Sequence, residues 1–173
     1  VVVWHTNGNK DREGIVRGKQ KEGNWTYYNG DGSVDFKFDY GTGLERVRIS
    51  ELEARDNIYY KIGKYRPYTG IVTESGGIKD YLLLGRFKSG NRDGQWVQWF
   101  RNGNKEVYGV YYRGKRHGEW SLWYEDGTMK ENGEFEMGEI NGTYKYWYNN
   151  GHLHMEQSYQ NGKPNGKWTW WYE

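Results

Sequence analysis

The sequence predicts an all-β protein built from tandem β-hairpins of about 24 residues. Glycine recurs with that spacing at Gly94, Gly118, Gly142 and Gly166, and an aromatic run follows each of them. Asn-Gly or Asp-Gly pairs follow the first three of these runs, and such pairs are the strongest short-range signal for a hairpin turn. Phe, Trp and Tyr make up 18% of the 173 residues, and these residue types favour strands. A fixed period with turn residues at constant offsets is typical of a repeat array.

The composition excludes several classes of protein. There are 25 basic and 23 acidic residues, so the charge balance argues against nucleic-acid binding driven by phosphate neutralisation. The absence of cysteine excludes disulfides, thiol catalysis and cysteine zinc sites. No apolar run approaches the roughly 20 residues that a membrane helix needs. Apolar surface is instead carried by the aromatic rings, which can form a core. The compartment is not indicated.

Numbering each repeat from its leading glycine as position 0 reveals two recurring sets of aromatic residues. The first set occupies positions +2 and +17 and is predicted to be structural: Trp25, Trp96, Trp120, Tyr144 and Trp168 at +2, and Phe87, Tyr111, Phe135 and Tyr159 at +17. The second set occupies position +5: Tyr28, Trp99, Trp123, Trp147 and Trp171. The repeat starting at Gly70 keeps Phe87 but lacks aromatic residues in its first half.

The Asn-Gly and Asp-Gly pairs at +8 and +9 predict two-residue type I′ turns, for example at Asn102-Gly103. Paired positions then sum to 17, so +2 faces +15 and +4 faces +13. Position +15 is glycine in three repeats, at Gly85, Gly109 and Gly133. This register leaves the +2 ring room to lie on the backbone opposite it.

The same register places the +5 aromatic residues on the other, mostly polar face. The +2 residues Trp96, Trp120 and Trp168 are therefore expected to be more buried than Trp99, Trp123 and Trp147. Rings at +5 recur on every second strand, roughly 10 Å apart. Two interpretations remain open: the +5 rings brace neighbouring strands over a minor core, or they form a partly open ladder that binds a partner.

The chain is expected to divide into three parts. Residues 1–43 form divergent hairpins, residues 44–69 form a degenerate hairpin or cap, and residues 70–173 form the regular array. In the middle part, an irregular hairpin turning at Asp56-Asn57 is favoured over a short helix from Glu51 to Arg55, because strand-like residues resume at Ile58.

The segments GEWSLWYEDG and GTYKYWYNNG, followed by aromatic and glycine residues at fixed offsets, resemble MORN-type repeats. They are most similar to the aromatic-rich variant found in bacterial YwqK-like antitoxin proteins. The resemblance implies an elongated, twisted, single-layer antiparallel sheet of stacked hairpins. It also implies a binding or scaffold role, with antitoxin activity as one form of it.

The sequence contains only weak candidates for catalytic or metal-binding groups, which favours a non-enzymatic protein without cofactors or metals. His152, His154 and Glu156 alternate along one strand and would share a face, but the trio belongs to a single repeat. The basic turn from Arg113 to His117 is expected to be exposed to solvent. No glycine-rich nucleotide-binding loop precedes a helix pattern.

We therefore expect a binding module for a protein partner, because repeat arrays expose extended surfaces and aromatic residues are enriched at binding hot spots. The alternative is binding to carbohydrate, the cell envelope or anionic lipid. The strands at Val1–Trp4 and Trp168–Tyr172 are expected to be edge strands, and unpaired edges favour self-association.

Overall fold

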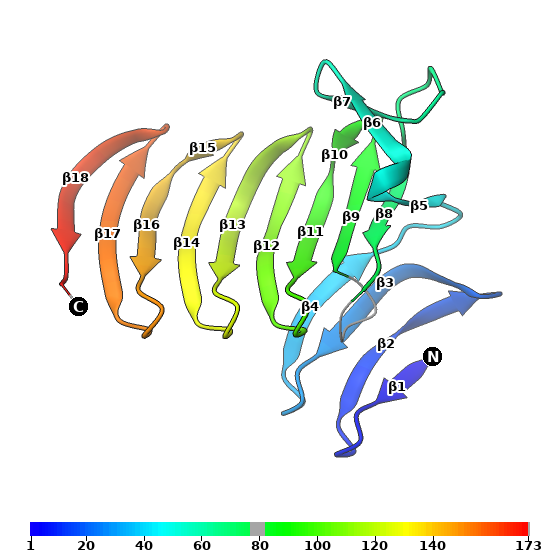
Figure 1. The fold of residues 1–173 in the computed structure, drawn as a ribbon, viewed down its shortest axis with the longest axis horizontal. Coiled ribbons are helices and arrows are strands. Elements are labelled where there is room, and N and C mark those ends of the chain that lie inside the picture. Colours follow the sequence, from blue (N-terminus) through cyan, green and yellow to red (C-terminus); the bar gives the residue numbers. More distant parts are fainter. Residues whose placement is uncertain (77–81, 173) are drawn as a thin grey trace. The chain divides into compact units, whose positions relative to one another are not determined.

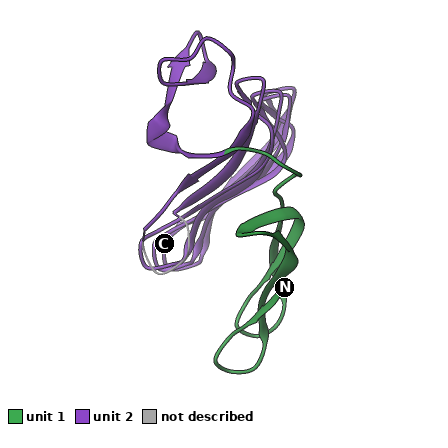
Figure 2. Cartoon of the chain, turned by 90° about the vertical axis from the view of Figure 1, so that its right-hand side faces the viewer, with its two compact units in different colours: residues 1–45 green, residues 46–173 purple. Residues whose placement is uncertain are grey.

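The computed structural model describes residues 1–76 and 82–172, and these form β-strands joined by turns and loops (Figure 1). The helical element among them is one 3-10 turn, η1 (Ile49–Glu51). The chain divides into two compact units, residues 1–45 (unit 1) and 46–173 (unit 2), coloured separately in Figure 2. No helix among the described residues is long and apolar enough to span a membrane.

Unit 1 is a four-stranded antiparallel sheet in chain order, β1-β2-β3-β4. The strands are β1 (Val2–Trp4), β2 (Lys10–Arg17), β3 (Gln20–Tyr28) and β4 (Val34–Asp39). Trp25 is buried, and its indole Nε1–H donates to the Ile15 carbonyl at 3.0 Å.

Unit 2 is a single curved layer of hairpins in which strands adjacent in the repeats pair antiparallel (Figures 1 and 2). The array strands are β8 (Gly70–Glu74), β9 (Leu83–Lys88), β11 (Gly94–Trp99), β12 (Lys105–Tyr112), β13 (Lys115–Trp123), β14 (Met129–Glu136), β16 (Gly142–Trp147), β17 (Leu153–Gln160) and β18 (Lys163–Trp170). Two short strands, β10 (Asn91–Arg92) and β15 (Glu139–Ile140), extend the hairpins at one end. Among the described residues β1 pairs only with β2 and β18 only with β17, and self-association through them stays a prediction.

The segment 44–69 joins the array through β5 (Arg46–Arg48), which pairs in parallel with β8. It continues as a hairpin of β6 (Leu52–Arg55) and β7 (Ile58–Lys61), in which Arg55 pairs with Ile58. Both Asp56 and Asn57 have positive φ, so the expected turn is confirmed and the alternative helix from Glu51 to Arg55 is wrong.

The predicted register is confirmed over most of each hairpin: Trp96 pairs with Gly109 and Gln98 with Val107. The predicted two-residue turn at Asn102-Gly103 is wrong. Gly103 N–H donates to the Phe100 carbonyl at 3.0 Å and Phe100 N–H to the Asn104 carbonyl at 2.8 Å, so the loop has three residues. Of the pair, only Gly103 has positive φ. The Asn102 side chain accepts the Asn104 N–H instead, an arrangement that Asn and Asp stabilise in turns.

Two-residue turns with positive φ at both positions occur at the opposite end of the hairpins. Arg113 and Gly114 have φ of 50° and 81°, and they join Tyr112 to its pairing partner Lys115. Equivalent turns are found at Ser89-Gly90, Met137-Gly138 and Asn161-Gly162.

The three-residue loop introduces a β-bulge that changes two side-chain positions. Trp99 pairs with Lys105, at +11, rather than with Glu106, at +12. The side chain at +11 therefore lies on the same face as the +5 rings. Lys105 Nζ accordingly lies 5.3 Å from the centroid of the Trp123 ring. Position +12, expected on that face, lies on the other one, where Lys130 Nζ is 5.7 Å from the Tyr124 ring.

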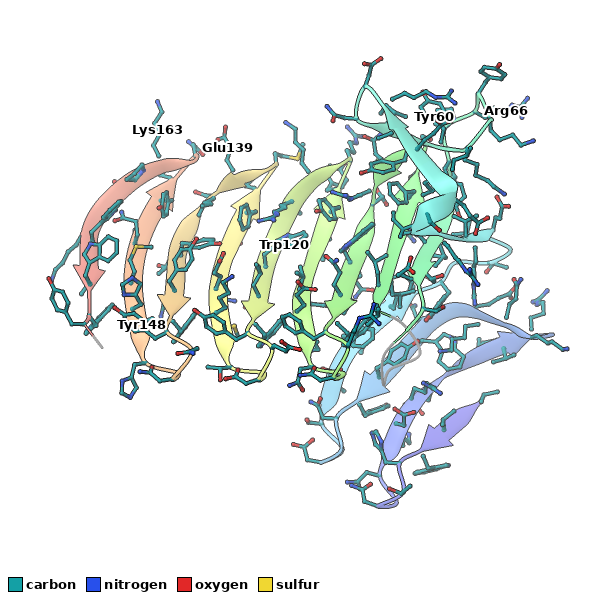
Figure 3. All side chains as sticks on the ribbon, in the orientation of Figure 1. Tyr60, Arg66, Trp120, Glu139, Tyr148 and Lys163 are labelled. Carbon is teal, nitrogen blue, oxygen red and sulfur yellow. The ribbon has the colours of Figure 1, made fainter. Side chains whose placement is uncertain are left out.

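The core of unit 2 is a continuous series of rings that we call the ring spine. It consists of Tyr59, Phe87, Trp96, Tyr111, Trp120, Phe135, Tyr144 and Tyr159, with successive centroids 4.8–6.4 Å apart. From Phe87 onward the rings meet edge to face, at 73–84°, a geometry worth about 0.5–1.5 kcal/mol per pair beyond area burial. Trp120 lies in the middle of the sheet in Figure 3.

Each +2 ring of the spine lies on a glycine at +15. This glycine belongs to the preceding repeat and is not the residue that pairs with the ring residue within its own hairpin. A Cβ on Gly109 would stand 2.2 Å from the Trp120 ring, and one on Gly85 would stand 2.3 Å from the Trp96 ring. The Trp120 indole N–H then reaches the Val110 carbonyl at 3.1 Å. Glycine at +15 is therefore required by the ring of the next repeat.

Candidate partner-binding face

The five +5 residues predicted to bind a partner differ in their exposure to solvent and in the unit to which they belong. Trp99 is only 6% exposed and belongs to the core. Trp123 and Trp147 are half-buried, and Trp171 is 40% exposed. Tyr28 lies in unit 1. We call Trp123, Trp147 and Trp171 the Trp ladder, of which Trp171 is the most exposed. The buried Trp99 fits the bracing interpretation, and the partial exposure of the other three fits the open ladder.

Tyrosine hydroxyls on the opposite face form hydrogen bonds to the backbone of two Trp ladder residues. The Tyr124 hydroxyl donates to the Trp147 carbonyl at 2.9 Å, and the Tyr148 hydroxyl donates to the Trp171 carbonyl at 3.1 Å. Tyr148 lies at the end of the strands opposite to Glu139 and Lys163 (Figure 3). The backbones of Trp147 and Trp171 are thus tied to the preceding repeat.

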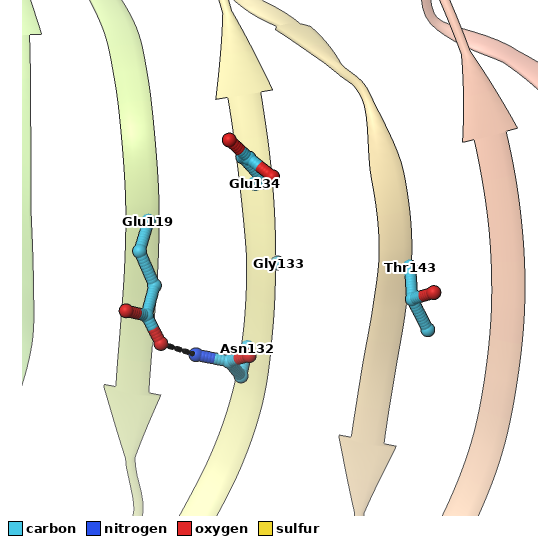
Figure 4. A pocket seen from close by; sticks show the side chains of 5 residues that line it. All are labelled: Glu119, Asn132, Gly133, Glu134 and Thr143. Atoms are coloured by element: carbon cyan, nitrogen blue, oxygen red, sulfur yellow. Dashed lines mark hydrogen bonds between the residues drawn. The ribbon is translucent and has the colours of Figure 1, made fainter.

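A polar hollow of about 470 Å³ lies on the same face as the Trp ladder (Figure 4). It is lined by Glu119, Asn132, Gly133, Glu134 and Thr143. Asn132 Nδ2 donates to Glu119 Oε1 at 2.8 Å, and Glu119 pairs across the strands with Glu134. In residues 1–76 and 82–172 neither carboxylate forms an ion pair, so both remain available as hydrogen-bond acceptors.

The expected order of burial holds for Trp120 against Trp123, is not seen for Trp96 and Trp99, which are both buried at 4% and 6% exposure, and is wrong for Trp168. Trp96 and Trp120 are buried, Trp120 to 2% exposure, whereas Trp123 and Trp147 are half-buried. Trp168 is 46% exposed although it occupies position +2.

Cations over the ring spine are a feature that the sequence interpretation missed. The Arg116 guanidinium lies 4.6 Å from the Trp120 ring and 5.3 Å from the Phe135 ring, so its assignment to a solvated basic turn is wrong. Arg92 lies in the same way over Trp96 at 4.9 Å. Both arginines stand two residues before a repeat glycine, and this constant offset was the available signal.

The histidine trio is divided between the two faces by the β-bulge. The His154 ring packs 4.2 Å from the Tyr148 ring, whereas Glu156 forms an ion pair with Lys145 at 3.1 Å on the side of the Trp ladder. The expectation that His152, His154 and Glu156 share a face is therefore wrong. Among the described residues no group of His, Asp or Glu is arranged to hold a metal ion.

Tyr144 and Tyr146 are kept neutral by their surroundings. Burial raises the pKa of the Tyr144 hydroxyl, and its hydrogen bond to Glu131 at 2.7 Å raises it further. Burial also raises the pKa of Tyr146, with a smaller contribution from the Glu131 charge. Both hydroxyls, Tyr144 in the spine and Tyr146 beside it, therefore act as hydrogen-bond donors and not as bases.

Tyr28 belongs to a polar network in unit 1. Glu13 accepts hydrogen bonds from Lys10, at 2.8 Å, and from the Tyr28 hydroxyl. The hydrogen bond from Lys10, followed by that from Tyr28, lowers the pKa of Glu13 below its ordinary 4.5. The hydrogen bond to Glu13 raises the pKa of Tyr28 above 10.0 and that of Lys10 above 10.5.

These shifts predict the pH window of the network. The stability that Glu13 contributes to the folded state is present above pH 4.5 and is lost as pH falls through the lowered pKa of Glu13. The Tyr28 and Lys10 contributions are present at neutral pH and are lost as pH rises through their raised pKa values. In an NMR titration Tyr28→Phe should move the Glu13 midpoint upward, toward 4.5. An unchanged midpoint would show that the Tyr28 hydroxyl does not interact with Glu13.

Residues 116–137 and 140–161 match the family model described as a MORN repeat variant. The matched segments contain Trp120, Tyr144 and the half-buried rings Trp123 and Trp147. A search of curated protein sequences finds no match. MORN repeats are commonly binding or scaffold modules, and the family is generally non-enzymatic.

Proposed function

We propose that the chain is a non-enzymatic binding module that engages a protein partner through the Trp ladder and the polar surface around it. The supporting observation is the partial exposure of three tryptophans at equivalent positions of successive repeats, all on one face of a single-layer sheet. Tryptophan is among the residues most enriched at binding hot spots. An antitoxin that masks a toxin would be one form of this function.

The surroundings of the Trp ladder fit a protein interface. Its rings recur on every second strand, roughly 10 Å apart, so a partner must be extended to contact all three. The Lys145–Glu156 ion pair and the side chains of Glu119 and Asn132 supply a polar surround. Aromatic residues within a polar rim are the usual composition of such interfaces.

The polar hollow favours a second candidate function, the binding of a carbohydrate. Two carboxylates without ion-pair partners, an amide and a hydroxyl provide the hydrogen-bonding groups that a polyhydroxylated ligand needs. In this alternative Glu134 and Asn132 contribute more to binding than the Trp ladder does.

Affinity measurements on matched variants separate the two candidates. A protein captured from the source cells is purified, and its Kd is measured against the wild type, Trp147→Ala and Tyr65→Ala. Trp147→Ala should weaken binding about 30-fold or more, as expected for a hot spot. Tyr65 is exposed but lies in the loop after β7, outside the ladder, and its variant should bind normally.

The carbohydrate alternative predicts a different pattern. Glycan-array binding would be lost in Glu134→Gln and retained in Trp147→Ala. Equal protein affinity for the wild type and Trp147→Ala, with both folded by circular dichroism, would contradict a role of the ladder in protein binding.

A further inference from the structure

The ring spine stops at Tyr159, although the next repeat supplies a tryptophan at the correct position. Trp168 stands at +2 of that repeat, where Trp96 and Trp120 continue the spine. Among the described residues Trp168 makes no ring contact with Tyr159. Its ring lies instead 5.6 Å from Trp170, which is 50% exposed.

One difference between Trp168 and the earlier +2 residues is the residue on which the ring would rest. Earlier spine rings rest on glycine at +15, and Gly133 would bring a Cβ within 2.2 Å of the Tyr144 ring. Position +15 of the repeat that starts at Gly142 is Gln157, which pairs with Trp168 and is completely buried. No ring can occupy the same volume as the Gln157 side chain.

Gln157 also takes the hydrogen bond that an indole would make. Trp120 and Trp25 each donate an indole N–H to the carbonyl of the residue that follows the glycine, Val110 and Ile15 respectively. The equivalent carbonyl belongs to Ser158, and Gln157 Nε2 donates to it at 2.6 Å. The glutamine thus replaces both the volume and the polar contact of the missing ring.

This arrangement is unfavourable in one respect. Gln157 Oε1 is buried without a hydrogen-bond partner, and such atoms are rare in folded proteins because the lost hydration is not replaced. Glycine at this position would remove the unsatisfied atom and permit the packing seen in the inner repeats. A residue that breaks the local rule in this way is typical of a functional constraint.

We propose that Gln157 is a stop residue: it ends the ring spine and keeps the indole of Trp168 on the protein surface beside Trp170. The spine then has two defined ends, Tyr59 of the β6–β7 hairpin and Tyr159 next to Gln157. Gln157 acts through Trp168 as a positioning residue. The inference is independent of which partner binds the Trp ladder.

Two substitutions at position 157 test the proposal in the full chain. Gln157→Gly removes the side chain that occupies the ring position. The Trp168 indole N–H should then donate to the Ser158 carbonyl and exchange with solvent about tenfold more slowly in ¹⁵N NMR. Gln157→Ala also removes the amide, but its Cβ occupies the volume of the ring, as the 2.2–2.4 Å distances at the other glycines show. Its Trp168 exchange should stay at the wild-type rate.

A double variant separates ring docking from the general effect of glycine in a strand. Gln157→Gly should decrease the unfolding equilibrium constant about tenfold when Trp168 is present. In a Trp168→Ala background the same change should increase this constant, because glycine weakens a strand. Unchanged Trp168 exchange in Gln157→Gly, or equal effects of the glycine and alanine variants, would overturn the proposal.

Discussion

Replacing Trp120 with alanine should lower the free energy of unfolding by about 3–5 kcal/mol, the range for deletion of a buried tryptophan. The side chain contacts the rings of Tyr111 and Phe135, lies on Gly109 and is covered by Arg116. Its loss leaves a cavity in the middle of the spine and removes the donor to Val110. Urea unfolding of the full chain measures the change.

Trp123→Ala is the matched control, because Trp123 lies in the same strand and is only half-buried. Its cost should be about 1–2 kcal/mol, within the range of ordinary substitutions. Equal costs for the two variants would show that the spine is not the main core of unit 2.

The second large effect is expected for Gly109→Ala, which should destabilise the protein by about 1–3 kcal/mol, as overpacking does. The new Cβ would stand 2.2 Å from the Trp120 ring, so the indole must move away from the Val110 carbonyl. Gly109 lies within β12 and does not have positive φ. The cost therefore reports the contact with the ring and not backbone strain. Thermal unfolding monitored by circular dichroism gives the value.

A double-mutant cycle identifies the cause. In a Trp120→Ala background the added methyl group meets no ring, so Gly109→Ala should cost little there. Gly30→Ala serves as a control, because a Cβ at Gly30 has no atom within 4 Å. A full cost in the Trp120→Ala background would show that the ring is not what excludes alanine.

The fold was predictable because its signals are local and repeated. Glycine at +15 and an aromatic residue at +2 must pair if the chain forms hairpins, and Trp96 does pair with Gly109. The turn type was less predictable, because an Asn-Gly pair fits two loops: a two-residue turn and a three-residue loop whose last residue is glycine. The Asn102 side chain stabilises the second by accepting the Asn104 N–H.

The site was predictable only in part, because exposure depends on contacts beyond one hairpin. Trp99, Trp123 and Trp147 occupy one position in three repeats, yet Trp99 is buried and the others are half-buried. We attribute the exposure of Trp168 to Gln157, which stands in the place of a glycine. The parallel pairing of β5 with β8 joins segments distant in sequence, and no periodic pattern marks it.

The role of the Trp ladder is tested most directly by measuring binding and stability on the same two variants. Trp147→Ala should lose about 30-fold or more in affinity for the captured protein, while its loss of stability should not exceed the roughly 1–2 kcal/mol expected for the equally half-buried Trp123. Trp96→Ala, in the spine, should lose stability, and at a temperature where it remains folded it should bind with wild-type affinity. Wild-type affinity in Trp147→Ala together with weakened binding in folded Trp96→Ala would contradict the proposal and place the binding site on the opposite face of the sheet.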